Sequence, residues 1–278
     1  MSQENAKQLA QQVWGATPAG SAHAPEFQPG TRDFFERVIA KRSTEELPFL
    51  YEVVPFASFA GKRVLELGCG AGYDAYEICR NKAVYTGIDL TPQNIERTRK
   101  HLELFGYTPT VQHGDAENLT FGDAQFDIIF SNGVLHHTPD MEKSFREACR
   151  VTKPGGEFWV ILYHKHSIFY WLSMFLWDHI LCRGYKERTF AERMSMIEGS
   201  TSGKFPLVNV YSRSSAAKIL RNAGWTPKQS WVRKLTPADL PCIPHVSRFW
   251  WHIPQSLLNF VGKGFGWYLI FRATKEAK

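Results

Sequence analysis

The sequence predicts an α/β fold built on a mostly parallel sheet, and three features of the chain point to it. From Arg63 onward, short apolar runs rich in β-branched residues alternate with helical stretches, as strands and crossover helices do in such sheets. The run EFWVILY at 157–163 is apolar throughout, which is typical of a central strand buried on both faces. Glycines directly follow the apolar run at 63–67, as a sharp turn from a strand into a helix requires.

Further runs along the chain have the length and composition of strands or helices. The helix after residue 91 is well marked, because Thr91 is a suitable N-cap and Pro92 suits the first helical position. We expect strands over residues 63–67, 84–88, 110–113, 126–130, 157–163, 226–232 and 267–273. We expect helices over residues 73–80, 92–105, 141–151 and 212–223.

Three segments do not follow this alternation. Residues 1–60 precede the sheet, and we expect them to form an extension or lid. Residues 1–20 are rich in Gln, Ala, Ser and Gly with little apolar periodicity, so we expect this start to lack regular structure. Residues 164–210 are too long for a simple crossover, and residues 234–261 are rich in Pro and Trp. Residues 61–278 are therefore expected to form one domain with two cap insertions, which would build the substrate pocket.

Length and composition are those of a globular protein with a substantial core. The chain has 278 residues, of which 44% are hydrophobic and 22% charged. The net charge of +6 is spread along the chain. A nucleic-acid binder would concentrate its basic residues on one face with stacking aromatics, so no nucleic-acid partner is expected. A basic surface that aids solubility, an anionic small substrate and an anionic membrane surface all remain compatible with this charge.

Cysteine usage and hydropathy bear on the compartment. The 5 cysteines lie far apart with no C-x-x-C pair, which favours free thiols in a reducing cytosol over disulfides or a zinc site. The first residues are polar, unlike a signal peptide. The longest apolar stretch, 168–182, contains Asp178 and His179 and is shorter than the roughly 20 residues that a spanning helix needs. We therefore expect a cytoplasmic protein.

The strongest motif is VLELGCGAG at 64–72. A strand leads into glycines spaced G-x-G-x-G and then into a helix, so a ligand can lie against bare backbone beside the helix N-terminus. A nicotinamide or flavin site would have G-x-G-x-x-G, but Tyr73 stands where the third glycine would be. The motif therefore argues against an oxidoreductase. A tight turn without a ligand is the alternative reading of the glycines alone.

Polar residues follow the next predicted strands. Asp89 ends the second strand, where an acidic side chain can accept hydrogen bonds from both ribose hydroxyls of a nucleoside; a helix-capping role is the alternative. Asp115 follows the third strand, where its carboxylate can accept a hydrogen bond from an adenine amino group. The fourth strand runs into SNGVLHH at 131–137. In open α/β sheets ligands bind outside these strand ends, so the residues are expected to meet there.

In the order VLELGCGAG, GID (87–89), GDAE (114–117), FDIIFSNGVLHH (126–137) and VTKPGG (151–156), the chain resembles the class I S-adenosylmethionine-dependent methyltransferases. It is most similar to the group that includes the ubiquinone and menaquinone C-methyltransferases and many small-molecule methyltransferases. The resemblance implies a Rossmann-like seven-stranded sheet with the last strand antiparallel, and S-adenosyl-L-methionine as cofactor. The N/D-P-P-Y/F motif of DNA and protein amino-methyltransferases is absent.

The resemblance also implies a role for each motif position. The loop glycines would approach the methionine part and the ribose, with Glu66 beneath the amino group and Asp89 on the ribose. Leu90 would pack on the adenine and Asp115 would bind its amino group, while Asn132 would contact the methionine end through its backbone. The implied cofactor-binding residues are Glu66, Gly68, Cys69, Gly70, Gly72, Asp89, Leu90, Asp115, Ala116 and Asn132.

An acceptor that loses a proton during methyl transfer needs a general base. His136 and His137 are catalytic candidates, because the fourth strand would deliver them to the edge of the cofactor and histidine titrates near neutral pH. A polar turn is the alternative reading of this pair. Tyr163 and His164, which leave the fifth strand, are further catalytic candidates.

His166, Tyr211 and Arg213 are expected to contact the substrate. Arg213 could bind a carboxylate or phosphate through two hydrogen bonds, or lie in solvent at the start of a helix. The aromatic segments 168–177 and 249–261 either pack as caps, line an apolar pocket for an aromatic or isoprenoid acceptor, or make shallow contact with a membrane beside the cations at 183–188. No carboxylate cluster indicates a metal, so none is expected.

We thus expect an enzyme that methylates a small molecule by in-line displacement. A methyltransferase acting on a lipid or quinone precursor at the membrane and a non-catalytic regulatory protein that binds S-adenosylmethionine are the alternatives. The sequence identifies neither the acceptor atom nor the oligomeric state.

Overall fold

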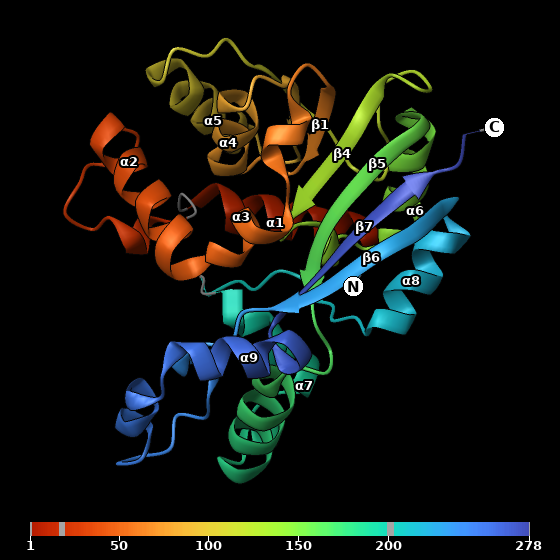
Figure 1. Cartoon of the computed structure of the whole chain (residues 1–278). Coiled ribbons are helices and arrows are strands. Elements are labelled where there is room, and N and C mark those ends of the chain that lie inside the picture. Colours follow the sequence, from red (N-terminus) through yellow and green to blue (C-terminus); the bar gives the residue numbers. More distant parts are fainter. Residues whose placement is uncertain (1, 17–19, 199–202, 278) are drawn as a thin grey trace.

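A seven-stranded sheet forms the centre of the computed structural model, which describes residues 2–16, 20–198 and 203–277 (Figure 1). The strand order is β3-β2-β1-β4-β5-β7-β6. Strands β1 to β5 run parallel, and β7 lies antiparallel between β5 and β6, which confirms the predicted fold class. The strands are β1 (Arg63–Leu67), β2 (Val84–Asp89), β3 (Thr110–His113), β4 (Phe126–Asn132), β5 (Thr152–Tyr163), β6 (Trp225–Arg233) and β7 (Tyr268–Lys275).

The ends of the strands lie within two residues of the predicted ones, except at the start of β5. Strand β5 begins at Thr152 rather than at residue 157, because Thr152 pairs with Phe126 of β4 before the ladder resumes at Glu157 and Ile128. Residues 153–156 bulge out between these two pairs. The KPGG sequence there fits an interruption of the ladder, since proline has no N–H to donate.

Helices cover both faces of the sheet and enclose two apolar cores. On one face α6 and α8 pack on residues such as Phe158, and Trp225 donates its indole N–H to the carbonyl oxygen of Phe145 (2.9 Å). On the other face Ile78 and Leu102 pack on β1, β2 and β4. The helices flanking the sheet are α4 (Tyr73–Arg80), α5 (Pro92–Leu104), η4 (Leu135–His137), α6 (Met141–Val151) and α8 (Arg213–Asn222).

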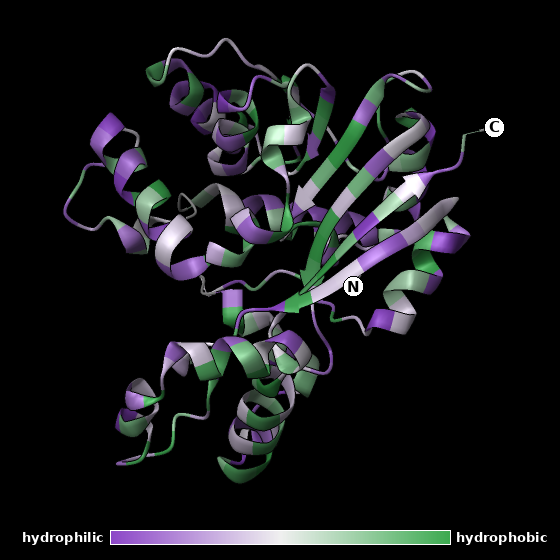
Figure 2. Cartoon of the chain, in the orientation of Figure 1, coloured by the Kyte–Doolittle hydropathy of each residue, from purple (hydrophilic) through white to green (hydrophobic). Residues whose placement is uncertain are grey.

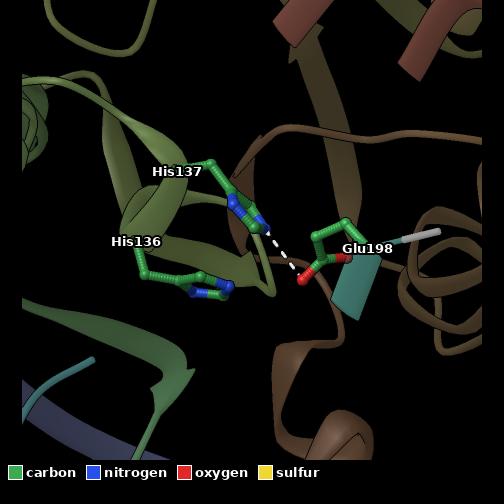
Figure 3. Close-up of side chains that lie close together, drawn as sticks. All are labelled: His136, His137 and Glu198. Atoms are coloured by element: carbon green, nitrogen blue, oxygen red, sulfur yellow. Dashed lines mark ion pairs between the residues drawn. The ribbon is translucent and has the colours of Figure 1, made fainter. Parts of the chain in front are cut away.

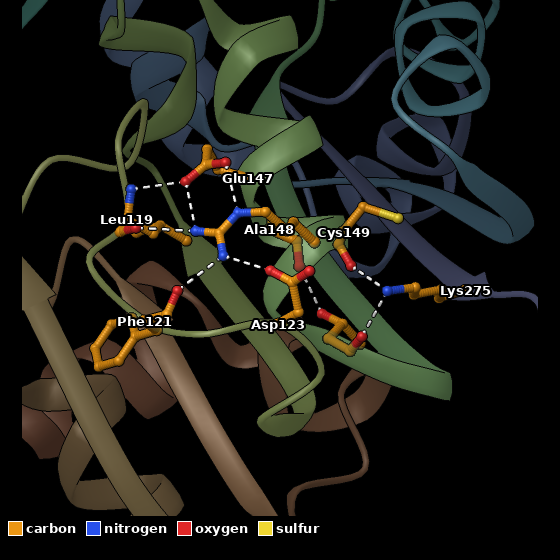
Figure 4. Close-up of polar contacts among 9 residues, drawn as sticks. Leu119, Phe121, Asp123, Glu147, Ala148, Cys149 and Lys275 are labelled. Carbon is orange, nitrogen blue, oxygen red and sulfur yellow. Dashed lines mark hydrogen bonds and ion pairs between the residues drawn. The ribbon is translucent and has the colours of Figure 1, made fainter.

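Two cations join the ends of elements at the edge of the sheet away from the strand carboxyl ends (Figure 4). Arg150, in the last turn of α6, donates to two carbonyl oxygens of the loop 119–123 (2.8 and 2.9 Å). Lys275, at the end of β7, donates to the carbonyl oxygens of Cys149 and Thr152 (both 2.8 Å). A cation at a helix C-terminus also interacts favourably with the helix dipole. These contacts hold the C-terminal end of α6 against the loop before β4 and against the end of β7.

The prediction that residues 1–20 lack regular structure is wrong for the described part; residues 17–19 lie outside the described residues. Residues 3–16 form a helix that contacts α5, and Ala6 and Val13 are its buried side chains. Because only these two side chains are buried, the sequence carries little apolar periodicity. The elements before the sheet are α1 (Gln3–Ala16), η1 (Ser21–His23), α2 (Arg32–Lys41), η2 (Arg42–Glu46), α3 (Pro48–Val53) and η3 (Phe56–Phe59).

Two helical caps leave the sheet at the carboxyl ends of β5 and β6. We name residues 164–212 the first cap and residues 234–267 the second cap. In Figure 1 both caps project below the sheet, and Ser173 of the first cap donates a hydrogen bond to the carbonyl oxygen of Asp239 in the second (2.6 Å). Their elements are η5 (Phe169–Leu181), η6 (Gly184–Lys186), α7 (Phe190–Ser195), η7 (Met196–Glu198), η8 (Pro237–Asp239), η9 (Ser247–His252) and α9 (Gln255–Phe265).

Candidate functional site

Two adjoining pockets open at the carboxyl ends of the parallel strands. The first pocket lies over β2, β3 and α1, where Asp89 and Asp115 contribute to its wall. The second pocket lies beside β1, β5 and the first cap, and its lining includes Glu66 and Glu198. Both pockets are lined by Trp14, Gly68, Asn132 and Gly133, so they lie on the two sides of a shared wall.

Asp89 is held at the rim of the first pocket by the backbone of two loops. Its carboxylate accepts hydrogen bonds from the N–H groups of Gly70 (2.9 Å) and Thr91 (2.8 Å). Burial raises the pKa of Asp89, and these hydrogen bonds oppose that shift by stabilising the charged form. A ligand whose hydroxyl groups donate hydrogen bonds to this carboxylate would further offset the free-energy cost of burying its charge.

Glycines form the base of the two pockets. At Gly133, whose φ is +74°, an added Cβ would meet no atom within 4 Å, so a side chain there would project into open space. At Gly68 an added Cβ would lie 2.4 Å from Val134, which keeps this position free of a side chain. Gly72 faces α5 instead, where a Cβ would lie 3.1 Å from the Cα of Thr98. Gly133 therefore leaves room for a ligand, whereas glycine at positions 68 and 72 allows the loop to pack closely against Val134 and α5.

Helix α1 lies over the first pocket and contributes residues that sequence reasoning missed. Lys7 forms ion pairs with Asp115 (2.7 Å) and Glu117 (2.6 Å). Gln11 donates a hydrogen bond to the carbonyl oxygen of Leu90 (2.9 Å). Lys7 and Trp14 line the pocket together with Leu90 and Ala116. The Asp115 carboxylate is thus bound by a side chain from α1, and the helix covers this end of the site.

The second pocket combines several carboxylates, of which Glu66 is buried, with one arginine. Tyr85 donates a hydrogen bond to the carboxylate of Glu66 (2.6 Å), and burial raises the pKa of Glu66 well above its ordinary value. Asp74 accepts hydrogen bonds from Arg42 (3.0 Å) and from the side chain of Asn132 (2.9 Å). Cys69 also lines this pocket. Carboxylates and a guanidinium in one small space suit a zwitterion with an ammonium and a carboxylate group.

His137 faces Glu198 on the wall of the second pocket (Figure 3), and Tyr163 contacts the same carboxylate. The hydroxyl of Tyr163 donates to Oε1 of Glu198 (2.8 Å), and Nε2 of His137 lies 3.8 Å from the same oxygen. Nδ1 of His137 donates to the carbonyl oxygen of Leu207 (2.6 Å), since that oxygen can only accept. When the imidazole is neutral, the free lone pair of Nε2 therefore faces Glu198. The arrangement can accept and retain a proton.

His136 completes a cluster with these two residues. Its ring is fully buried, burial lowers its pKa well below the ordinary value, and neither ring nitrogen has a hydrogen-bond partner among the described residues. One atom each from His136, His137 and Glu198 lie within 4.8 Å of one another, the one set of potential metal ligands found in the described part of the chain. Because its pKa is lowered, the His136 ring is neutral near pH 7, and it packs against the rings of His137 and Tyr163 rather than holding a proton.

The remaining predicted residues do not line either pocket. Side chains alternate along a strand, so His164 points away from Tyr163 and its Nδ1 bonds to the carbonyl oxygen of Gly266 (3.1 Å). His166 is exposed. Tyr211 extends the sheet by donating its N–H to the carbonyl oxygen of Tyr163 (2.9 Å). Arg213 is exposed on α8 and donates to the hydroxyl of Ser230 (2.9 Å).

Known proteins resemble this chain in sequence. Residues 58–196, half of the chain, match the family described as "Methyltransferase domain". A phthiotriol/phenolphthiotriol dimycocerosates methyltransferase of Mycobacterium leprae (strain TN) is 38% identical over 101 residues, which cover 36% of this chain and 37% of that protein. Squalene methyltransferase 2 of Botryococcus braunii is 28% identical over 205 residues, covering 72% of this chain and 47% of that protein. The matches thus span less than half the length of these relatives.

A solved structure shares the fold over nearly its whole length. The geranyl diphosphate C-methyltransferase from Streptomyces coelicolor A3(2), solved with Mg²⁺, geranyl diphosphate and S-adenosyl-L-homocysteine, has a TM-score of 0.62 to this chain at 13% identity. The alignment covers 97% of each chain.

Proposed function

Because the chain belongs to the methyltransferase domain family, we propose that it transfers a methyl group from S-adenosylmethionine to a small-molecule acceptor. The observation that supports this most is that the two pockets adjoin at Gly68 and Gly133, which line both. A cofactor that joins a nucleoside to an amino acid needs one pocket with a carboxylate that binds the ribose. It needs a second pocket with acidic and basic side chains that bind the ammonium and carboxylate groups of the amino acid.

The residues around the pockets have the chemistry to hold such a cofactor. Asp89 would accept hydrogen bonds from the ribose hydroxyls, with the adenine between Leu90 and Ala116 in the first pocket. In the second pocket the carboxylates of Glu66 and Asp74 would hold the ammonium group, and Arg42 would bind the carboxylate. When bound, the cofactor supplies an electrophilic methyl group on a sulfonium.

Glu198 is the residue best placed to receive a proton from the acceptor. It lines the second pocket, and the hydroxyl of Tyr163 fixes the orientation of its carboxylate. His137 lies behind it and can hold the proton in turn. Alignment of acceptor and methyl at about 3–3.5 Å supplies most of the acceleration in such displacements, and a base adds a further factor when the acceptor must lose a proton.

The acceptor is proposed to be apolar or amphiphilic. The names of the similar proteins refer to dimycocerosates and squalene, and Phe169 of the first cap and Trp267 of the second form an aromatic cluster with Tyr163, which lines the second pocket. A lipid acceptor taken from a membrane is the second candidate, and the exposed apolar side chains of the caps favour it.

Cofactor binding is tested by calorimetry with S-adenosylhomocysteine on the full chain. Asn tolerates positive φ, so Gly133→Asn adds a side chain to the pockets with little backbone strain. We expect this variant to lose binding by at least a hundredfold. Gly106→Asn is the matched control, because Gly106 has a φ of +80° and open space but lies at the end of α5 outside both pockets. Absence of binding to the parent protein would overturn the proposal.

Catalysis is tested with S-adenosylmethionine carrying a tritiated methyl group, offered with a lipid extract and, separately, with a water-soluble extract. If the acceptor loses a proton, Glu198→Gln should lower the rate about 10²- to 10⁴-fold and leave the Kd for S-adenosylhomocysteine unchanged. Glu187→Gln, an exposed acid of the same cap, should have no effect. Tight cofactor binding without transfer into either extract would instead favour a regulatory protein without catalysis.

A further inference from the structure

The two caps carry most of the exposed large hydrophobic side chains. Among the described residues, all such side chains except Tyr51 and Val84 lie between residues 171 and 265. Soluble monomers rarely expose apolar patches of more than a few hundred Å², and larger ones mark contacts with proteins or membranes. The exposed residues of the first cap are Trp171, Leu172, Leu176, Ile180, Leu181, Tyr185 and Met196, and those of the second are Val246, Phe249, Trp251, Leu257, Phe260 and Phe265.

Helix α9 presents apolar side chains on both of its sides. Leu258 and Gly262 are buried, and Gly262 packs against Leu235. On the outer side Phe260 is 72% exposed and Leu257 is 52% exposed. A surface helix normally turns polar residues outward. The outer side of α9 therefore offers an apolar surface to a binding partner or a membrane.

Helices η5 and η9 also expose apolar side chains on their outer sides. Leu172, Leu176 and Ile180 are spaced four residues apart along η5, which sets them on one side of this helix, and each is about 40% exposed. In η9 the side chain of Trp251 is 70% exposed. Tryptophan is enriched where a protein contacts the boundary between lipid headgroups and acyl chains.

The charges around these side chains favour an anionic surface. In residues 234–266, all of which the structure describes, the exposed charged side chains are Arg248 and Lys263. The acid of this segment, Asp239, is buried and accepts a hydrogen bond from the Thr236 N–H. The first cap adds the exposed basic residues Arg183, Lys186 and Arg188, which outnumber the neighbouring exposed acids Glu187 and Glu192. A second copy of the chain would bring like charges together, whereas anionic headgroups complement them.

Both caps lie at one end of the molecule. They leave the sheet at the carboxyl ends of β5 and β6, and the hydrogen bond from Ser173 to Asp239 holds them together. Figure 2 shows hydrophobic residues along both caps, in the part of the molecule that projects away from the sheet. No helix in the described part of the chain is long and apolar enough to cross a bilayer.

From this arrangement we propose that η5, η9 and α9 form a docking face that lies on the surface of an anionic lipid bilayer. Interfacial helices of this kind insert aromatic and aliphatic side chains below the headgroups while cations contact the phosphates. The apolar side chains supply the affinity, and Arg248 and Lys263 supply the preference for anionic lipid.

A groove beside α9 shares a wall residue with the second pocket. Glu46 lines that pocket and also the adjacent groove, whose other wall includes Lys234, Asn259 and Lys263. The Nζ of Lys234 lies 5.0 Å from the centre of the Tyr268 ring, and Tyr268 lines the second pocket. An amphiphile held in the bilayer could thus reach the site along a polar groove. This step, unlike docking itself, rests on the proposed function.

Docking is tested by co-sedimentation of the full chain with vesicles of phosphatidylcholine containing 30% phosphatidylglycerol, without cofactor. We expect binding at low salt that weakens at least fivefold in pure phosphatidylcholine. Trp251→Ser/Phe260→Ser should lower the partition coefficient at least tenfold, and Arg248→Gln/Lys263→Gln should abolish the preference for anionic lipid. Val84→Ser, which changes an exposed apolar residue outside the caps, should bind like the parent.

Each variant is first compared with the parent by thermal melting and by calorimetry with S-adenosylhomocysteine. Because the substituted side chains are exposed, both measurements should be unchanged, and a failure of cofactor binding would concern the proposed function alone. The docking proposal is overturned if the parent does not sediment with anionic vesicles, if the aromatic variant binds equally well, or if sedimentation velocity finds a dimer that the aromatic variant dissociates.

Discussion

His101 lies behind the glycine loop and links this loop to α5. Its ring is fully buried and stacks on Phe35 at 3.9 Å between centroids. Nδ1 donates to the carbonyl oxygen of Ala71 (2.9 Å), which belongs to the loop that leads into α4. Burial lowers the pKa of His101 to about 4, because the charged ring would lose its hydration.

This histidine should make the stability of the protein depend on pH. The folded pKa lies below the unfolded value of about 6.5, so between these values the unfolded chain binds more protons and stability falls as pH falls. Each pKa unit corresponds to about 1.4 kcal/mol, so His101 should account for about 3 kcal/mol lost between pH 7 and pH 4. We expect urea unfolding of His101→Phe to show a correspondingly smaller loss over this range. An identical pH dependence in parent and variant would contradict the assignment.

Single residues of the site were predictable where a strand end fixes their position. Asp89 ends β2 and His137 lies shortly after β4, and the topology brings both to the carboxyl edge of the sheet. Arg42 and Glu198 were missed, because each comes from an irregular region with no motif, and tertiary packing alone brings it to the second pocket. His164 was expected beside Tyr163, but the alternation of side chains along β5 separates them.

At the scale of elements, prediction succeeded where local sequence determines the structure. The strand, glycine turn and helix at 63–80 have the predicted bounds, because apolar periodicity and positive-φ glycines act within a few residues. Helix α1 was missed, because its stability depends on contacts made far along the chain. Arg97, for example, donates hydrogen bonds to the carbonyl oxygens of Trp14 (3.1 Å) and Gly15 (2.8 Å).

Helix α1 should control the escape of a ligand from the first pocket. Lys7→Met removes the two ion pairs with Asp115 and Glu117, and Glu117 is then left as a buried carboxylate without this cation. A loss of about 1 kcal/mol in the docking of α1 corresponds to a dissociation rate of S-adenosylhomocysteine raised about five- to tenfold. Stopped-flow fluorescence of Trp14, which lines both pockets, measures this rate.

Gln8→Met is the matched control, since Gln8 is exposed on the other side of α1 and bonds to Glu4 of the same helix. It should leave the dissociation rate unchanged. Equal rates for Lys7→Met and the parent would show that α1 does not limit release.

At the scale of the whole molecule, the two pockets join segments that are distant in the sequence. Trp14 of α1, Arg42 of η2, Gly133 after β4 and Glu198 of the first cap all line the second pocket. The sheet order fixes the carboxyl edge where these segments meet, so the location of the site was predictable from the fold. The composition of its walls was not, because the N-terminal helices and the first cap follow no periodicity of the sheet.

A ligand that fills both pockets should therefore stabilise these distant segments together. At 100 times its Kd, S-adenosylhomocysteine should add about 2.7 kcal/mol to the free energy of unfolding. Hydrogen exchange followed by mass spectrometry should slow in α1 and in η7, which contribute to the pockets, and stay unchanged in η9 and the outer turns of α9, which face away. Slower exchange in η9 but not in α1 would place the ligand outside the two pockets. Adding anionic vesicles without the ligand should produce the opposite pattern, because the bilayer contacts the caps and leaves α1 free to exchange.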